Sequence, residues 1–439
     1  MIRKMRIAGI LVALLLFCGC DMRTVDEMFA LPERPASDYN LEQAIYHAMS
    51  GLEYSAPKTG ENQQIVQTAD LDGNGEVEYL LFAKGEDEHP LKILIFDKLK
   101  DSYNHVDTIS CNGYAFDRVE YAQIDGNPGY EIVVGSQLNG ELTRNVSIYA
   151  FRVGQSAQLL NTNYSQLIVG DLDADHLEEV FIIRPGSLDT DKGVVSLYGM
   201  ENGVMERSVE RNLSAPAERV KRILISNLEE GHRAVYVASA IGDSTLITDV
   251  YALRSDTLTN VSLSLDVGTS VQTMRNYYVY ADDIDEDGVM ELPSLVDMVS
   301  VTASTNASLN KLIRWYSMDI FGQEIDKCYT YHNFVDGWFL DIQPEWVDFL
   351  AIARQDNEID FFVWDMQNRV PIRLFSIAAL TGQNREEMSQ KDGRFILYQS
   401  DSIIYCGEIT ATGENYEITQ QGLCDGFHLI WQDWNHEGI

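Results

Sequence analysis

Residues 70–78 read Asp-Leu-Asp-Gly-Asn-Gly-Glu-Val-Glu, and two similar stretches follow at 171–179 (Asp-Leu-Asp-Ala-Asp-His-Leu-Glu-Glu) and 283–291 (Asp-Ile-Asp-Glu-Asp-Gly-Val-Met-Glu). We call them loop 1, loop 3 and loop 5, and we number their positions 1 to 9. Each has oxygen-bearing side chains at positions 1, 3, 5 and 9 and leads into an apolar, strand-like segment. Because the same unit recurs along the chain, the sequence predicts a modular fold.

The oxygen spacing in these loops suits a hard cation. Ca²⁺ takes six to eight oxygen ligands at about 2.3–2.6 Å, and a small residue at position 6 lets the chain turn sharply around it. The predicted ligands are the side chains of Asp70, Asp72, Asn74, Glu78, Asp171, Asp173, Asp175, Glu179, Asp283, Asp285, Asp287 and Glu291, with the carbonyls of Glu76, Leu177 and Val289 at position 7. The sequence thus predicts structural Ca²⁺; the alternative is a set of solvated acidic turns without metal.

Two further copies are degenerate. Loop 2 (123–131) offers oxygens at the same positions and predicts a weak metal site, because Pro128 fixes φ near −65° at position 6, where loops 1 and 5 have glycine. Its candidate ligands are Gln123, Asp125, Asn127 and Glu131. Loop 4 (227–235) carries Asn227 and Glu229 but has Val235 at position 9, which predicts a structural turn without an ion.

Four strand-like runs fit between successive loops, whose first positions are 53, 48, 56 and 56 residues apart. In the first three repeats the runs are 64–69, 79–83, 91–96, 105–110, 119–124, 132–134, 146–151, 157–160, 166–170, 180–183, 194–198 and 205–209. Short strands divided by Gly, Asn and Asp turns favour an all-β fold with four-stranded blades, a β-propeller expected to have seven. A β-sandwich is the alternative, but it gives no reason for one metal loop at a fixed place in each unit.

The loops and the apolar segments after them resemble the FG-GAP/VCBS class of propeller repeats over roughly residues 60 to 300. In that family the acidic loop binds Ca²⁺ between two strands of a blade. The resemblance implies a calcium-binding repeat protein of the bacterial surface, a lipoprotein in some members. It implies nothing about catalytic activity.

The two ends of the chain differ from the repeats. Residues 1–19 read as a signal peptide, with a basic start and an apolar run at 7–17 that is too short to span a bilayer of about 30 Å. Gly19-Cys20 resembles a lipobox, which predicts a lipid on Cys20 and a tether at 20–37; secretion without a lipid is the alternative. Asp38 is a candidate cap for a helix that presents Leu41, Ile45 and Met49 on one face.

After the repeats, predicted at 38–310, residues 311–439 contain all six tryptophans. We interpret this segment as degenerate blades or as a small α+β domain, with helical stretches expected at 384–390 and 423–431. Cys111, Cys328, Cys406 and Cys424 form no metal-binding spacing, so they are either free thiols or paired in a way that the sequence does not reveal.

The formal net charge of −36 argues against binding to nucleic acid. The sequence has no HExxH, GxSxG, P-loop or helix-opening GxGxxG motif, so it predicts no enzyme. The first hypothesis is a non-catalytic, calcium-stabilised propeller anchored by Cys20 to the outer face of the cytoplasmic membrane, where it binds a protein or polysaccharide. The alternative is an envelope enzyme that acts on glycans or phosphoesters. A sensor component is a third option.

Overall fold

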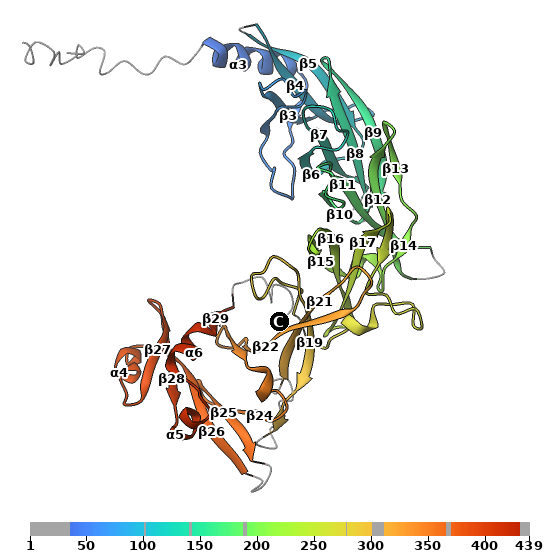
Figure 1. Ribbon diagram of the computed structural model, residues 1–439. Helices are drawn as coiled ribbons and strands as arrows, with labels where there is room; N and C mark the ends of the chain where they lie inside the picture. The colour runs from blue at the N-terminus through green and yellow to red at the C-terminus, as the bar shows by residue number, and fades with distance from the viewer. Residues whose placement is uncertain are drawn as a thin grey trace, which may run out of the picture.

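The computed structural model describes residues 36–100, 102–139, 143–187, 191–277, 279–300, 311–365 and 370–430. These residues form six mainly antiparallel β-sheets that follow one another along the chain in an open arc (Figure 1). The prediction of an all-β chain is confirmed. The predicted signal peptide and Cys20 lie outside the described residues. Within the described part, no helix is long and apolar enough to cross a membrane.

The first four sheets are built mostly from strands in sequence order. Their strands are β1 (Glu53–Tyr54), β2 (Val66–Ala69), β3 (Glu78–Lys84), β4 (Leu91–Leu99) and β5 (Ser102–Cys111); β6 (Ala115–Ala122), β7 (Glu131–Asn139), β8 (Thr143–Arg152) and β9 (Gln155–Tyr164); β10 (Gln166–Gly170), β11 (Glu179–Pro185), β12 (Gly193–Glu201), β13 (Val204–Arg207) and β14 (Arg211–Asn212); and β15 (Val220–Glu229), β16 (His232–Ile241), β17 (Thr245–Arg254) and β18 (Thr257–Asn260). Every strand-like run predicted in the first three repeats overlaps one of these strands.

The last two sheets are less regular. The fifth holds β19 (Leu292–Asp297), β21 (Lys311–Met318), β22 (Glu324–Asn333), β23 (Trp338–Ile342) and β29 (Phe427–Leu429); the sixth holds β20 (Val299–Ser300), β24 (Leu350–Gln355), β25 (Glu358–Asp365), β26 (Val370–Thr381), β27 (Arg394–Gln399) and β28 (Ile403–Ile409). The fifth sheet therefore takes strands from both sides of residue 310.

Short helices accompany the sixth sheet. They are α4 (Arg385–Ser389), α5 (Ala411–Asn415) and α6 (Gln420–Asp425). The helix expected at 384–390 is present as α4. The one expected at 423–431 ends early, because residues 427–429 form β29 and pair with β23.

Consecutive sheets pack face to face, and strict alternation along the second strand of each repeat makes this possible. In β7, Ile132 and Val134 join the core shared with the first sheet, whereas Val133 faces the third sheet. In β11, Ile182 faces the second sheet and Phe181 faces the fourth. Because successive side chains of a strand point to opposite faces, a continuous apolar strand is buried on both sides.

A helix covers the outer face of the first sheet. This helix, α3 (Ala36–Ala48), packs Leu41 and Ile45 against a cluster that contains Leu81 and Phe96, which confirms the predicted helix. The predicted cap is wrong, because the helix begins at Ala36 and Asp38 lies within its first turn. Among the described residues, no strand of the first sheet pairs with a strand of the sixth. The expected closed ring of seven blades is thus not observed, because a helix rather than another sheet covers this face of the first sheet. The four cysteines Cys111, Cys328, Cys406 and Cys424 are free.

The turns that carry the acidic loops lie against one another. A Cβ atom on Gly129 would stand 2.3 Å from the carbonyl oxygen of Leu71, and one on Gly73 would stand 2.3 Å from Cβ of Pro128. Gly129 also has a φ of 99°, which L side chains rarely adopt. Loops 1 and 2 are therefore packed backbone to backbone, and only glycine fits at these two positions.

We expect Gly129→Ala to lower the free energy of unfolding by about 3 kcal/mol, since it adds a backbone clash to the strain of positive φ. The matched control is Gly154→Ala, where φ is 73° and nothing lies within 4 Å of the added atom. The control removes about 1 kcal/mol through strain alone. Urea denaturation measures both, and equal losses in the two variants would contradict the proposed close packing.

Candidate metal loops and a neighbouring pocket

The structure brings three carboxylates together in each of loops 1, 3 and 5. One ligand oxygen from positions 1, 3 and 9 lies within 4.8 Å of the other two in every loop. The clusters are Asp70, Asp72 and Glu78; Asp171, Asp173 and Glu179; and Asp283, Asp285 and Glu291. Three negative charges this close repel one another, so the arrangement is compatible with a cation such as Ca²⁺.

Position 1 shapes each loop by accepting hydrogen bonds from the backbone. The position 6 N–H donates to Asp70 Oδ2 at 3.0 Å, to Asp171 Oδ2 at 3.1 Å and to Asp283 Oδ2 at 2.9 Å. Position 6 has positive φ in all three loops, with values of 87° at Gly75, 73° at His176 and 86° at Gly288. His176 thus adopts the backbone conformation that glycine supplies in the other two loops.

Positions 5 and 7 lie outside the three carboxylate clusters. The position 5 side chains of Asn74, Asp175 and Asp287 accept hydrogen bonds from the position 7 N–H groups at 2.7, 2.7 and 2.9 Å. These contacts close each turn through the position 7 N–H groups. The predicted ligand carbonyls of Glu76, Leu177 and Val289 belong to the same position 7 residues.

The glutamate at position 9 is buried in all four loops that have one. Its Oε2 accepts a hydrogen bond from the position 2 N–H, at 2.6 Å in Glu78, 2.8 Å in Glu131, 2.8 Å in Glu179 and 3.2 Å in Glu291. Glu78 is 0% exposed, and its Oε1 has no hydrogen-bond partner among the described residues. A buried carboxylate oxygen without a partner is costly, so this atom marks the place where a cation would bind.

Burial also changes the acidity of these glutamates. Burial is the largest cause, the neighbouring aspartates of each loop add to it, and the position 2 N–H opposes both. Together they raise the pKa of Glu78, of Glu179 and of Glu291 from 4.5 to about 7. At neutral pH a bound cation would therefore compete with protons at position 9.

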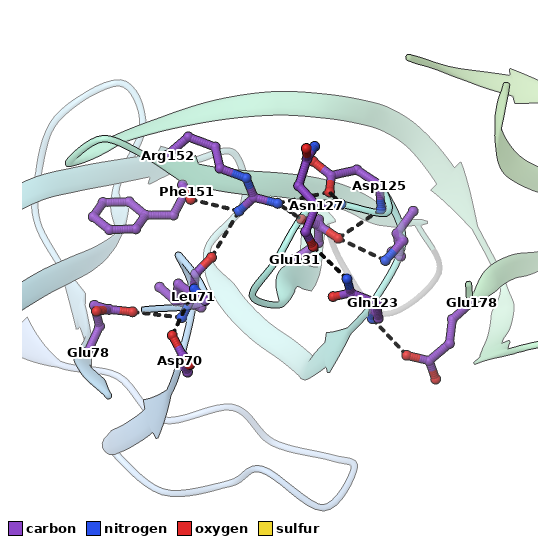
Figure 2. A network of polar contacts seen from close by, with 12 residues as sticks. Asp70, Leu71, Glu78, Gln123, Asp125, Asn127, Glu131, Phe151, Arg152 and Glu178 are labelled. Carbon is purple, nitrogen blue, oxygen red and sulfur yellow. Dashed lines mark hydrogen bonds and ion pairs between the residues drawn. The ribbon is translucent and has the colours of Figure 1, made fainter. Parts of the chain in front are cut away.

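Loop 2 holds a side chain of the protein where loops 1 and 3 have open carboxylates. Arg152 Nη2 donates to Asp125 Oδ1 at 2.9 Å and to Glu131 Oε1 at 2.6 Å (Figure 2). Gln123 Nε2 donates to the carbonyl of Asn127, at 2.5 Å, and thereby closes the turn on itself. As in the other three loops, position 4 has positive φ, here at Gly126, but the second positive φ moves from position 6, which Pro128 occupies, to position 7 at Gly129.

In loop 4 the candidate oxygens contact other parts of the protein. Asn227 Nδ2 donates to the carbonyl of Gly288 at 2.8 Å, and Glu229 Oε1 pairs with His232 Nδ1 at 3.2 Å. The loop is a tight hairpin between β15 and β16, in which Asn227 pairs directly with Arg233. This agrees with the prediction of a structural turn.

Loop 5 contains a cation that sequence reasoning missed. Lys327 Nζ, from β22, forms an ion pair with Asp287 and lies 4.0 Å from Asp285 Oδ2 and 3.8 Å from Glu291 Oε1. A metal ion at loop 5 would have to displace this ammonium group. Lys327 is 40 residues from Asp287 in the sequence, and no motif signals the contact.

A cavity of about 520 Å³ adjoins loop 5. Its lining includes the acidic stretch 282–286, Phe339 and Asp341 of β23, and His428 of β29. His428 Nε2 is 3.4 Å from Asp341 Oδ2, and this hydrogen bond raises the pKa of the imidazole above its usual value, although burial opposes it. The ring of His428 stacks on Phe339 at 4.7 Å. No sequence motif signals this group, because its members are far apart along the chain.

No family model and no curated protein matches the chain. Among solved structures it is similar to the rhamnogalacturonan lyase YesW, with 14% identity, a TM-score of 0.30 and coverage of 69% of this chain and 73% of that one. It is also similar to the exotype rhamnogalacturonan lyase YesX, with 11% identity, a TM-score of 0.28 and coverage of 82% of this chain and 73% of that one. The Bacillus licheniformis rhamnogalacturonan lyase PL11 is 13% identical, with a TM-score of 0.28 and coverage of 80% of this chain and 66% of that one. At these TM-scores the likeness assigns no activity to this chain.

These structures nevertheless run against two expectations from the sequence. A non-catalytic propeller that binds a protein or polysaccharide was expected, but the three solved structures are all rhamnogalacturonan lyases. Both the binding-protein hypothesis and the prediction of no enzyme are therefore corrected. The absence of catalytic motifs is no evidence against an enzyme, because such motifs report only groups that are close together in the chain.

The raised pKa values predict a pH dependence in the presence of a chelator. The folded protein binds protons at Glu78 up to pH about 7, whereas the unfolded chain releases them near 4.5. The unfolding free energy of the wild type, relative to that of Glu78→Gln, should therefore fall as the pH rises from about 4.5 to about 7 and stay constant above that range. Urea titrations across this range measure it, with exposed Glu345→Gln as control. A difference that rises with pH would contradict the burial effect.

Proposed function

We propose that the protein is a calcium-binding protein displayed outside the cytoplasmic membrane and tethered there by a lipid on Cys20. Loops 1 and 3 take Ca²⁺ as a structural ion, and loop 5 takes it more weakly because Lys327 competes. The observation that carries the proposal is the environment of the carboxylate at position 9, which is clearest in Glu78. One of its oxygens is bound by the backbone, and the other is buried beside two aspartates without a partner.

The chemistry of the donors favours calcium among the common metal ions. Every candidate donor is an oxygen, and neither histidine nor cysteine belongs to the three described clusters. Zinc and copper prefer nitrogen or sulfur, and magnesium prefers a small octahedral site that keeps several waters. The turns also supply carbonyl and amide oxygens beside the carboxylates, which suits the higher coordination number of Ca²⁺.

The finer features of the fold belong to the same proposal. We assign loops 1 to 5 to FG-GAP/VCBS-like repeats, in which each four- or five-stranded sheet is the equivalent of a propeller blade. Face-to-face packing of consecutive sheets supports this assignment. So does the place of the loops: each of loops 1 to 4 connects two paired antiparallel strands, and loop 5 leads directly into β19. In this view the ions fix the hairpins at one edge of the stack.

A second candidate function is catalysis on a glycan in the cavity beside loop 5. The specific observation that favours it is the His428–Asp341 pair on the wall of this cavity. An imidazole held by a carboxylate can take up and release a proton near neutral pH, which is the task of a general acid or base. A Ca²⁺ ion bound at Asp283 and Asp285 would supply positive charge to the same cavity.

We expect a chelator to lower the thermal midpoint of the purified protein, because an ion that binds only the folded state at 100 times its dissociation constant stabilises it by about 2.7 kcal/mol. Asp72→Asn should reduce this calcium-dependent shift, and Asp348→Asn, at an exposed site outside the loops, should leave it unchanged. Calorimetry with added CaCl₂ or EDTA measures the shift. Identical melting curves in both solutions would remove the calcium proposal.

Catalysis in the cavity predicts that turnover of a glycan depends on His428. A panel of neutral and acidic polysaccharides is incubated with the protein, and new reducing ends or unsaturated products are measured. His428→Gln should lower the rate at least about 100-fold, as expected for loss of a general acid or base. His89→Gln, an exposed histidine in the first repeat, is the control. If no polysaccharide is cleaved, or if both variants cleave equally, the cavity is not a catalytic site of this kind.

A further inference from the structure

The guanidinium group of Arg152 occupies the centre of loop 2 (Figure 2). Its Nη2 contacts Asp125 and Glu131, which stand at positions 3 and 9 and correspond to Asp72 and Glu78 of loop 1. Arg152 is the last residue of β8, so its side chain reaches the loop from a neighbouring strand of the same sheet.

The comparison of Glu131 with Glu78 shows what the arginine replaces. Both glutamates are 0% exposed, and both use Oε2 to accept the position 2 N–H, at 2.8 Å in loop 2 and 2.6 Å in loop 1. The two differ at Oε1. In Glu78 this atom has no hydrogen-bond partner among the described residues, and in Glu131 it accepts from Arg152 at 2.6 Å.

The other arm of the guanidinium reaches the preceding repeat. Arg152 Nη1 donates to the carbonyl of Leu71 at 2.9 Å and to the carbonyl of Phe151 at 2.7 Å. Leu71 lies between Asp70 and Asp72, two of the candidate ligands of loop 1. A single planar cation thus joins the carboxylates of loop 2 to the backbone of loop 1, which a spherical ion bound within loop 2 would not do by hydrogen bonding.

We propose that Arg152 is the permanent cation of loop 2: it takes the place of the metal ion, excludes Ca²⁺ from this loop and clamps loops 1 and 2 together whether or not calcium is present. The predicted weak metal site of Gln123, Asp125, Asn127 and Glu131 is thereby reassigned as an arginine site. The inference deepens the calcium proposal, and it rests on that proposal only where it compares loop 2 with loops that take an ion.

The first test of the clamp is made in EDTA, where no loop holds a metal. Arg152→Met leaves the buried charge of Glu131 uncompensated and should lower the thermal midpoint by several degrees. Glu131→Gln combined with Arg152→Met should recover much of this loss. Arg152→Lys, which keeps the charge but not the two-armed contact, should melt between the wild type and Arg152→Met. The control is Arg207→Met, which removes an arginine from a surface pair with Glu210.

The second test asks whether the arginine excludes calcium. Calcium at millimolar concentration should raise the midpoint of Arg152→Met by more than it raises that of the wild type, because positions 1, 3, 5 and 9 of loop 2 then become open to the ion. The double variant should lose this extra response. Isothermal titration should find one more calcium ion per chain in Arg152→Met than in the wild type.

The outcomes separate the two proposals. If no variant responds to calcium, the calcium proposal fails, and the EDTA measurements still decide whether Arg152 is a clamp. If Arg152→Met melts like the wild type in EDTA, or if the wild type binds calcium at loop 2 as the variant does, the inference is overturned.

Discussion

Backbone hydrogen bonds between consecutive loops hold the repeats in register. At three of the four junctions the carbonyl at position 1 of one loop accepts a hydrogen bond from the N–H at position 8 of the next loop. The N–H of Tyr130 donates to the carbonyl of Asp70 at 3.1 Å, that of Glu178 to Gln123 at 2.7 Å and that of Met290 to Asn227 at 2.9 Å. At the remaining junction loop 4 is too short for this contact, and Arg233 Nη1 donates to the carbonyl of Asp171 at 2.7 Å instead. Each hairpin is thus fixed by its neighbour, so the distance between sheets and the position of every acidic cluster depend on this series.

The loops are cross-linked further by charge. Loop 2 is joined to loop 1 through Arg152 and to loop 3 through the side chain of Glu178, whose Oε2 accepts the Gln123 N–H at 2.8 Å. A row of acidic turns would otherwise repel along the edge of the stack. Arg152 in loop 2 and Lys327 at loop 5 relieve part of this repulsion.

Local patterns were sufficient to predict the strands and the three acidic clusters. Alternating apolar residues place Ile132 and Val133 on opposite faces of one strand, and the spacing of Asp70, Asp72 and Glu78 makes their convergence a property of the turn itself. Contacts between distant residues were beyond such patterns. Loop 5 matches the acidic pattern best, yet Lys327 reaches it from another strand, and His428 meets Asp341 only because β29 returns to the fifth sheet. The open arc escaped prediction for the same reason, since closure depends on what covers the outer sheets.

The helix α3 has a consequence for assembly. A stack whose inner members bury both faces has two terminal faces of the same apolar character, and an uncovered one would recruit the end of another molecule and start a fibre. Leu41 and Ile45 of α3 occupy that surface on the first sheet, while Tyr46 on the opposite side of the helix is exposed to solvent. By covering this surface, the helix leaves no apolar sheet face there on which the end of another molecule could stack.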